Sequence, residues 1–135
     1  MEQLATCSHE KPVRELFDTV SRPKRKDGRR IRALDLNGKD RALLQAISDP
    51  AFNISGITNK AIREKLRGQP GYEGRTEKQL RAKLSRQLRL LRDHGLIRKV
   101  PRQFKYQLSA NGRELTTALN ALLAASIKQL MDAAA

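Results

Sequence analysis

The sequence has no tryptophan, one cysteine and few aromatic residues of any kind, and each shortage limits the folds and functions that fit the chain. Only 4% of the 135 residues are aromatic although 39% are hydrophobic, so the core has to be built from Leu, Ile and Ala. Such a core favours packed helices. The length suits one compact domain with an arm attached. We therefore expect a mainly α fold around a single core.

Reactive and metal-binding side chains are also scarce. The single cysteine, Cys7, excludes an internal disulfide. Cys7 and His9 lie close together in the sequence, but His94 is the only other histidine, which leaves too few soft ligands for a zinc site. No acid pair, metal cluster or phosphate-binding loop is present either. We therefore expect no metal, no cofactor and no enzymatic activity, and assign no catalytic residue.

Long apolar runs and a charged leader followed by an apolar segment are missing as well. The basic stretches of the sequence lack the bulky apolar face with Trp or Phe that an interfacial helix uses. We expect no membrane partner, and a location in the cytoplasm or on the nucleoid.

Positive charge is concentrated in two stretches of an otherwise near-neutral chain. The formal net charge is +14. Residues 75–105 contain eleven basic residues against Glu77 and Asp93, and residues 22–32 contain seven against Asp27, so all other positions together carry −1. Clustered Lys and Arg displace the counterions that are condensed on a polyanion. The expected partner is nucleic acid.

The N-terminal part is predicted to form a short helix followed by a basic arm. Apolar residues at helical spacing indicate a helix from near Pro12 to the Ser21–Pro23 stretch, namely Val13, Leu16, Phe17 and Val20. The run 22–30 has no apolar phase and contains Pro and Gly, so we expect an extended arm or linker. Basic arms contact phosphates or a minor groove, whereas the alternative is a merely solvated linker. The candidate DNA contacts of the arm are Arg22, Lys24, Arg25, Lys26, Arg29 and Arg30.

Two short helices are expected next. The first follows Asn37-Gly38 and ends at Pro50, and its apolar positions are Leu43, Leu44 and Ile47. The apolar residues Phe52 and Ile54 alternate with a polar residue, as in a short strand, so we expect a strand there. Thr58 is a good N-cap for the second helix, and Gly68 is placed to close it in the left-handed conformation.

A basic helix is predicted from Thr76 to His94. Thr76 and Gln79 have the spacing of a capping box, and Gly95 follows the last turn. Its leucines share one narrow sector of the helix, which would anchor it to the core: Leu80, Leu84, Leu88 and Leu91. The opposite sector carries Lys78, Ala82, Ser85, Arg86 and Arg89.

This outer sector has the chemistry of a helix that enters a major groove. Arg86 and Arg89 can bond to guanine O6 and N7, Ala82 and Ser85 can meet a thymine methyl or a phosphate, and Arg81 lies on the phosphate-contacting flank. The alternative is an ordinary solvated amphipathic helix. A solvated face usually mixes both charges, yet no acidic residue occurs between Lys78 and Arg92. That absence favours DNA contact.

A hairpin is expected after the basic helix. Residues 96–100 and 105–108 have the pattern of strands joined by the turn 101–104. The order helix, short strand, helix, basic helix, hairpin resembles the winged helix-turn-helix superfamily, in particular the MarR-like bacterial transcriptional regulators. Residues 89–100, RLLRDHGLIRKV, are similar to a recognition helix turning into the first wing strand, and residues 105–115, KYQLSANGREL, to the second wing strand and the following helix.

The resemblance covers roughly positions 40–116. It implies a three-helix core, a recognition helix in the major groove and a hairpin wing over the neighbouring minor groove or backbone. Arg102 and Gln103 match the wing tip. The candidate wing contacts are Arg98, Lys99, Arg102, Gln103 and Lys105. We divide the chain into an N-terminal helix and arm (1–37), a winged-helix domain (38–108) and a C-terminal helix (109–135).

The C-terminal helix, capped by Ser109, is longer than a small core requires, and its apolar arc reaches Ile127 and Met131. Terminal helices form the dimer interface in the resembling regulators, so we expect a homodimer through this helix. The face formed by Val13, Phe17 and Val20 is a candidate contributor. The alternative is that the N-terminal and C-terminal helices pack on each other within one chain.

Three functions fit these patterns. The first is a sequence-specific transcriptional regulator that binds double-stranded DNA as a dimer. The second is a non-catalytic DNA-binding or protein-contact module of a mobile-element or defence nucleoprotein complex. The third is an RNA-binding basic protein, which the shortage of aromatic stacking residues disfavours.

Overall fold

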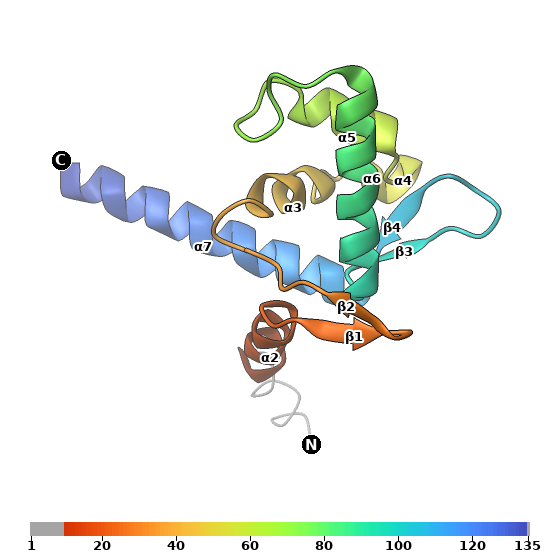
Figure 1. Cartoon of the computed structure of the whole chain (residues 1–135). Coiled ribbons are helices and arrows are strands. Elements are labelled where there is room, and N and C mark those ends of the chain that lie inside the picture. Colours follow the sequence, from red (N-terminus) through yellow and green to blue (C-terminus); the bar gives the residue numbers. More distant parts are fainter. Residues whose placement is uncertain (1–9, 135) are drawn as a thin grey trace.

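A computed structural model describes residues 10–134, so Cys7 and His9 lie outside the described part of the chain (Figure 1). The fold is mainly helical, with two separate antiparallel hairpins. No helix within residues 10–134 is long and apolar enough to cross a membrane. The elements in chain order are α2 (Glu10–Val20), β1 (Lys24–Lys26), β2 (Arg29–Ile31), α3 (Arg41–Ile47), α4 (Phe52–Ser55), α5 (Asn59–Leu66), α6 (Glu77–Asp93), β3 (Ile97–Lys99), β4 (Tyr106–Leu108) and α7 (Ala110–Ala134).

The helices α3, α5 and α6 enclose one aliphatic core, as the apolar spacing predicts. α5 packs between α3 and α6, and the leucine stripe of α6 is no more than 2% exposed. This burial anchors α6 along its length and leaves its opposite face in solvent. The core side chains from these helices are Leu43, Leu44, Ile47, Ile62, Leu66, Leu80, Leu84, Leu88 and Leu91.

The predicted helix ends are confirmed by their hydrogen bonds. The Thr58 hydroxyl accepts from the Ala61 amide, and Thr76 and Gln79 form a reciprocal capping box. Gly68 and Gly95 have positive φ angles of 82° and 76° beyond the ends of α5 and α6. Only glycine adopts this left-handed conformation readily, so both helices stop where the sequence places a glycine.

The short strand expected at Phe52 and Ile54 is wrong, because these residues belong to the helix α4. The Asp49 carboxylate accepts from the Ala51 amide at 2.9 Å and so starts a helical turn after Pro50. Phe52 points into the core and Ile54 is 91% exposed. Extended backbone occurs slightly later, where Ile57 exchanges two backbone hydrogen bonds with Tyr106 of β4.

The extended arm expected over residues 22–30 is also wrong, because the chain folds there into the hairpin β1–β2. Asp27 and Gly28 form a two-residue turn with φ angles of 52° and 75°, and Lys26 pairs with Arg29. Such Asp-Gly turns have the twist that a tight hairpin needs. The last residue of the hairpin, Ile31, is buried and only 3% exposed.

The two terminal helices pack on each other within the chain. α2 contacts α7, and Val20 is fully buried. The α2 face therefore packs at least in part inside the molecule, as in the alternative of two terminal helices packed within one chain, and its contribution to a dimer stays a prediction. The distal half of α7 projects beyond the core (Figure 1). It exposes Leu122, Ile127, Leu130 and Met131.

α7 crosses the root of the hairpin β3–β4 at Gly112. The Ser109 hydroxyl accepts from the Gly112 amide at 3.0 Å, which confirms the predicted cap, and donates to the Gly95 carbonyl oxygen at 2.6 Å. A Cβ atom on Gly112 would lie only 1.8 Å from the Leu96 carbonyl oxygen. The crossing therefore requires glycine for its small size.

We expect Gly112→Ala to lower the free energy of unfolding by about 1–3 kcal/mol, because the added methyl group overpacks the crossing. The change would otherwise stabilise a helix interior by about 1 kcal/mol. Urea unfolding followed by circular dichroism measures the difference. Asn111→Ala, at an exposed position of the same turn, is the control. An unchanged or increased stability of Gly112→Ala would contradict the close crossing.

Candidate nucleic-acid interface

The outer face of α6 is a solvent-exposed basic strip. Each residue predicted to contact DNA from this helix is exposed, while the leucine stripe on the opposite side is buried. No acidic residue occurs between Lys78 and Arg92, so nothing on this part of α6 neutralises the strip locally. The exposed members are Lys78, Arg81, Ala82, Ser85, Arg86 and Arg89.

α5 fixes the position of the strip through Asn59. The Asn59 side-chain amide donates to the Arg81 carbonyl oxygen at 3.0 Å and to the Ser85 hydroxyl at 2.9 Å. At the start of α6, Glu77 accepts from Arg63 and Arg67 of the α5 segment. The acidic residue in the first turn is thus already paired with cations of the same molecule.

The long loop between α5 and α6 covers one flank of α6. Tyr72 is buried, and its hydroxyl donates to the Gln87 side-chain oxygen at 3.2 Å. Lys83 donates to the Gly71 carbonyl oxygen at 2.7 Å and lies 4.6 Å from the centroid of the Tyr72 ring. Burial, together with the nearby charges of Arg75 and Arg86, lowers the pKa of Lys83.

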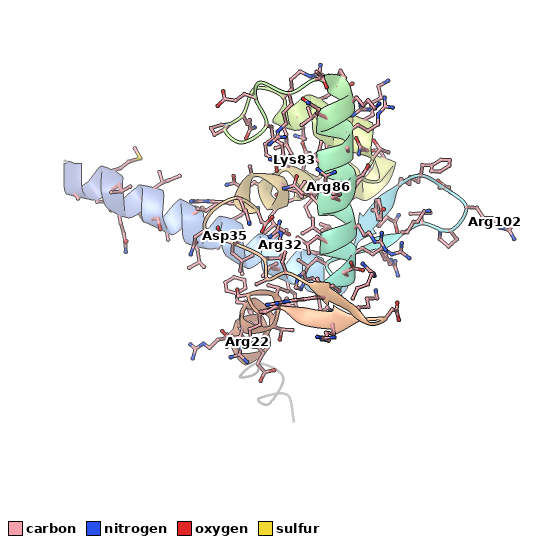
Figure 2. All side chains as sticks on the ribbon, viewed as in Figure 1. Arg22, Arg32, Asp35, Lys83, Arg86 and Arg102 are labelled. Carbon is pink, nitrogen blue, oxygen red and sulfur yellow. The ribbon has the colours of Figure 1, made fainter. Side chains whose placement is uncertain are left out.

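The hairpin β3–β4 stands beside the opposite flank of α6. Its strands pair from Ile97 with Leu108 to Lys99 with Tyr106, and Arg102 lies at its tip, away from α6 (Figure 2). Phe104 is 94% exposed, and Lys99 lies 5.9 Å from its ring centroid. Four of the predicted wing contacts, Arg98, Lys99, Arg102 and Gln103, are exposed, and the fifth, Lys105, is half-buried.

The hairpin β1–β2 lies across the carboxyl end of α6. Lys26 and Arg29 approach the Asp93 carboxylate at 3.6 and 3.7 Å, and these contacts leave Asp93 only 8% exposed. The His94 ring nitrogen Nε2 lies 2.8 Å from the Arg32 carbonyl oxygen, which accepts its hydrogen bond. The basic residues of the hairpin are thereby held next to the basic strip rather than on a free arm.

Arg32 and Asp40 anchor the end of this hairpin to the core. Two guanidinium nitrogens of Arg32 donate to the two Asp40 oxygens at 2.8 and 2.9 Å, and the Asp35 amide donates to Asp40 at 2.7 Å. Asp40 is 1% exposed. Burial alone would raise the pKa of Asp40, but the hydrogen bonds from Arg32 and Asp35 outweigh it and hold that pKa below its usual value.

A basic hollow of about 470 Å³ opens between the hairpin β1–β2 and α6. Figure 2 shows Arg32, Lys83 and Arg86 along this side of α6. The hollow brings together residues about sixty positions apart in the sequence. We call it the basic hollow, and its lining is Arg29, Arg30, Ile31, Arg32, Lys39, Lys83, Arg86, Gln87, Arg89, Leu90 and Asp93.

The predicted contacts of the arm do not all join this surface. Arg29 and Arg30 line the basic hollow together with Arg86 and Arg89. Arg22 instead follows the end of α2 and lies apart from α6 (Figure 2). The remaining hairpin residues Arg25 and Lys26 are exposed, and Lys24 is half-buried.

Sequence reasoning missed three cations of this surface, Arg32, Lys39 and Lys83. Of these, Arg32 directly follows the docked hairpin β1–β2, which a local signal could have revealed: Asp27-Gly28 is a strong two-residue turn signal. The structure also shows that the Ser85 hydroxyl accepts a hydrogen bond from Asn59 of α5, which no sequence pattern indicates.

Comparisons with protein-family models, curated proteins and solved structures give no match for this chain. Within residues 10–134, no group of three or more His, Cys, Asp or Glu side chains is placed to hold a metal ion.

The anchor at Asp40 predicts a specific loss of stability in acid. A carboxylate whose pKa is lower in the folded than in the unfolded state stabilises the fold above the unfolded pKa, about 3.9, and loses that contribution as the pH falls through the folded value. We expect Asp40→Asn to be clearly less stable than the wild type at pH 7. The difference should shrink between about pH 5 and pH 2.

Urea unfolding at a series of pH values measures this difference. Asp18→Asn, at an exposed position of α2, is the control for general effects of removing one negative charge. A gap between Asp40→Asn and wild type that stays constant from neutral to acid pH would contradict the proposed role of the ion pair.

Proposed function

We propose that the protein is a winged-helix protein that binds double-stranded DNA, with α6 in the major groove and the hairpin β3–β4 as the wing. The observation that carries the proposal is the outer face of α6, which is cationic, free of acid and flanked by two basic hairpins. Three helices around one core with a hairpin directly after the third helix are the parts that such a fold requires.

The dimensions and side chains of α6 suit a major groove. The groove is about 12 Å wide and admits a helix whose outer side chains reach the base edges. Ala82 and Ser85 are small and permit close approach, while Arg86 and Arg89 can each bond to a guanine. Lys78 and Arg81 lie nearer the first turn, where phosphate contacts orient the helix.

The hairpin β1–β2 limits which part of α6 can enter a groove. It covers Asp93 at the last turn, so the turns from Lys78 to Arg89 form the accessible part of the strip. In the proposal, Arg25 and Arg30 meet the phosphate backbone beside the groove.

Transcriptional regulation is the role that we propose for this binding, with the DNA-binding module of a mobile-element or defence complex as the alternative. Both need the same surface, and they differ in whether the chain selects a DNA sequence by itself. RNA binding is the weaker candidate, because the strip offers guanidinium groups but few aromatic rings for stacking on unpaired bases.

We further propose a homodimer formed through the distal half of α7. Leu122 and Leu130 continue the apolar stripe whose buried members are Leu115 and Leu119, and the exposed Ile127 and Met131 lie farther round the helix. From residue 117 onward, the described part of α7 carries only Lys128 and Asp132 as charged residues. Two copies can meet here without bringing their basic surfaces together, which favours a second copy as the occupant.

Arg86→Ala tests the base-reading role of α6. A preferred duplex is first selected from a random pool, and its affinity is then measured by fluorescence anisotropy at fixed salt. We expect Arg86→Ala to weaken binding to the selected duplex by about 1–3 kcal/mol and to relax the base preference at one position.

Arg14→Ala, an exposed position on α2, is the matched control and should bind the duplex like the wild type. Equal losses of Arg86→Ala on selected and random duplexes would reject base reading. A pool that yields no consensus would favour the module of a larger complex. Stronger binding of RNA than of duplex DNA at matched salt would overturn the proposed function.

Light scattering after size exclusion tests the dimer. We expect the wild type to be a dimer at micromolar concentration and Ile127→Glu with Leu130→Glu to be a monomer, because two carboxylates would enter an apolar interface. Lys128→Glu introduces the same kind of charge on the other side of α7 and should remain dimeric. A monomeric wild type would reject the proposal.

A further inference from the structure

The basic hollow is concave, so it differs in shape from a flat basic surface. Its volume of about 470 Å³ lies within the range of about 300–1,000 Å³ that is typical of sites for small ligands. Its walls come from three separate segments: the hairpin β1–β2 and the residues after it, the loop before α3, and α6. Cationic side chains from all three converge on one space.

The charges around the hollow are strongly unbalanced. Its cations are Arg29, Arg30, Arg32, Lys39, Lys83, Arg86 and Arg89, whereas Asp93 is the single acidic residue of the lining. Asp93 already faces Lys26 and Arg29. Within residues 10–134, no ion pair is formed by Arg30, Lys39, Arg86 or Arg89. The hollow therefore carries several positive charges that no acidic side chain of the described residues balances.

The site is also preorganised. Arg32 is fixed by its two hydrogen bonds to the buried Asp40, and Lys83 is held by the Gly71 carbonyl oxygen above the Tyr72 ring. Partial burial, together with the charges of Arg75 and Arg86, lowers the pKa of Lys83. An anion that enters the hollow therefore meets two cations, Arg32 and Lys83, whose positions are already set, which reduces the entropy lost on binding.

Phosphate is the anion that best matches this set of groups. Guanidinium groups bond to phosphate oxygens through two parallel N–H donors, and lysines add point charges. A single phosphate cannot engage cations on three walls of a hollow of this size. Two or more phosphates linked in a row carry enough charge and length to do so.

We propose that the basic hollow is a binding site for linked phosphate groups. The phosphates come either from consecutive positions of a DNA backbone or from a free polyphosphate such as a nucleoside triphosphate. The DNA source rests on the proposed function, whereas binding of a free polyphosphate does not. A free ligand in the hollow would occupy Arg86 and Arg89 and thereby compete with DNA.

Inorganic triphosphate is the probe for this site, measured by isothermal titration calorimetry on the full chain at about 0.1 M salt, where screening acts beyond about 10 Å. We expect binding of one triphosphate per chain, weakened about tenfold by Lys39→Ala and by Arg30→Ala because each removes a charge-assisted contact. Arg102→Ala, at the wing tip outside the hollow, should bind triphosphate like the wild type. Circular dichroism verifies that each variant is folded.

Two results would overturn the site. One is triphosphate binding that Lys39→Ala, Arg30→Ala and Arg102→Ala weaken equally, since that would mean diffuse attraction to the whole basic surface. The other is equally tight binding of citrate, whose carboxylates carry a similar charge without phosphate geometry. Neither result would affect the Arg86→Ala test on duplex DNA, so the two proposals can fail separately.

The source of the phosphates is distinguished with modified ligands. If the DNA backbone fills the hollow, a neutral methylphosphonate at one particular position will weaken duplex binding by the wild type but not by Lys39→Ala. If a free nucleotide is the ligand, a nucleoside triphosphate will bind more tightly than inorganic triphosphate and displace duplex DNA. A duplex that shows no position coupled to Lys39, together with no nucleotide preference, would reject both sources.

Discussion

Repulsion between like charges is the constraint on which the rest of this structure depends. A chain with a net charge of +14 has to hold many cations on one surface without driving that surface apart. Three of its acidic residues lie where basic segments join: Asp40 holds Arg32, Asp93 lies between Lys26 and Arg29, and Glu77 lies between Arg63 and Arg67. Asp93 and Glu77 each pair with two cations, so these three carboxylates partner five cations.

Much of the core and of α6 follows from local sequence. Thr76 with Gln79 and the leucine stripe of α6 are signals within a single helix, and the structure agrees with both. The basic hairpin β1–β2 was not predicted, because only Ile31 supplies it with buried apolar surface. Its stability comes from contacts with residues some sixty positions away, and no local period reports such contacts.

The error at Phe52 has a different cause. A single alternation of apolar residues is compatible with a helix as well as a strand, and the turn in which Asp49 accepts from the Ala51 amide leads into the helix. The lining of the basic hollow could not be predicted from the sequence, for a third reason. Lys39, Lys83 and Arg30 share no pattern in the chain, and only the folded backbone brings them together.

A folded hairpin in place of a mobile arm changes the thermodynamics of any encounter with a polyanion. An extended basic arm loses conformational freedom when it is immobilised, about 1–2 kcal/mol for each ordered backbone residue. The residues of β1–β2 are already ordered by the Asp27-Gly28 turn and by Asp93. Association is then governed more by desolvation and counterion release than by folding of the arm.

The junction at Ser109 and Gly112 has a mechanical consequence. One hydroxyl group links the end of α6 to the start of α7, and the close crossing at Leu96 leaves no room for α7 to swing. The root of the hairpin β3–β4, α6 and α7 are therefore held in a fixed relative orientation. In an assembly joined through the distal half of α7, the angle between two copies of α6 would be set by the turn at Ser109 rather than by a flexible linker.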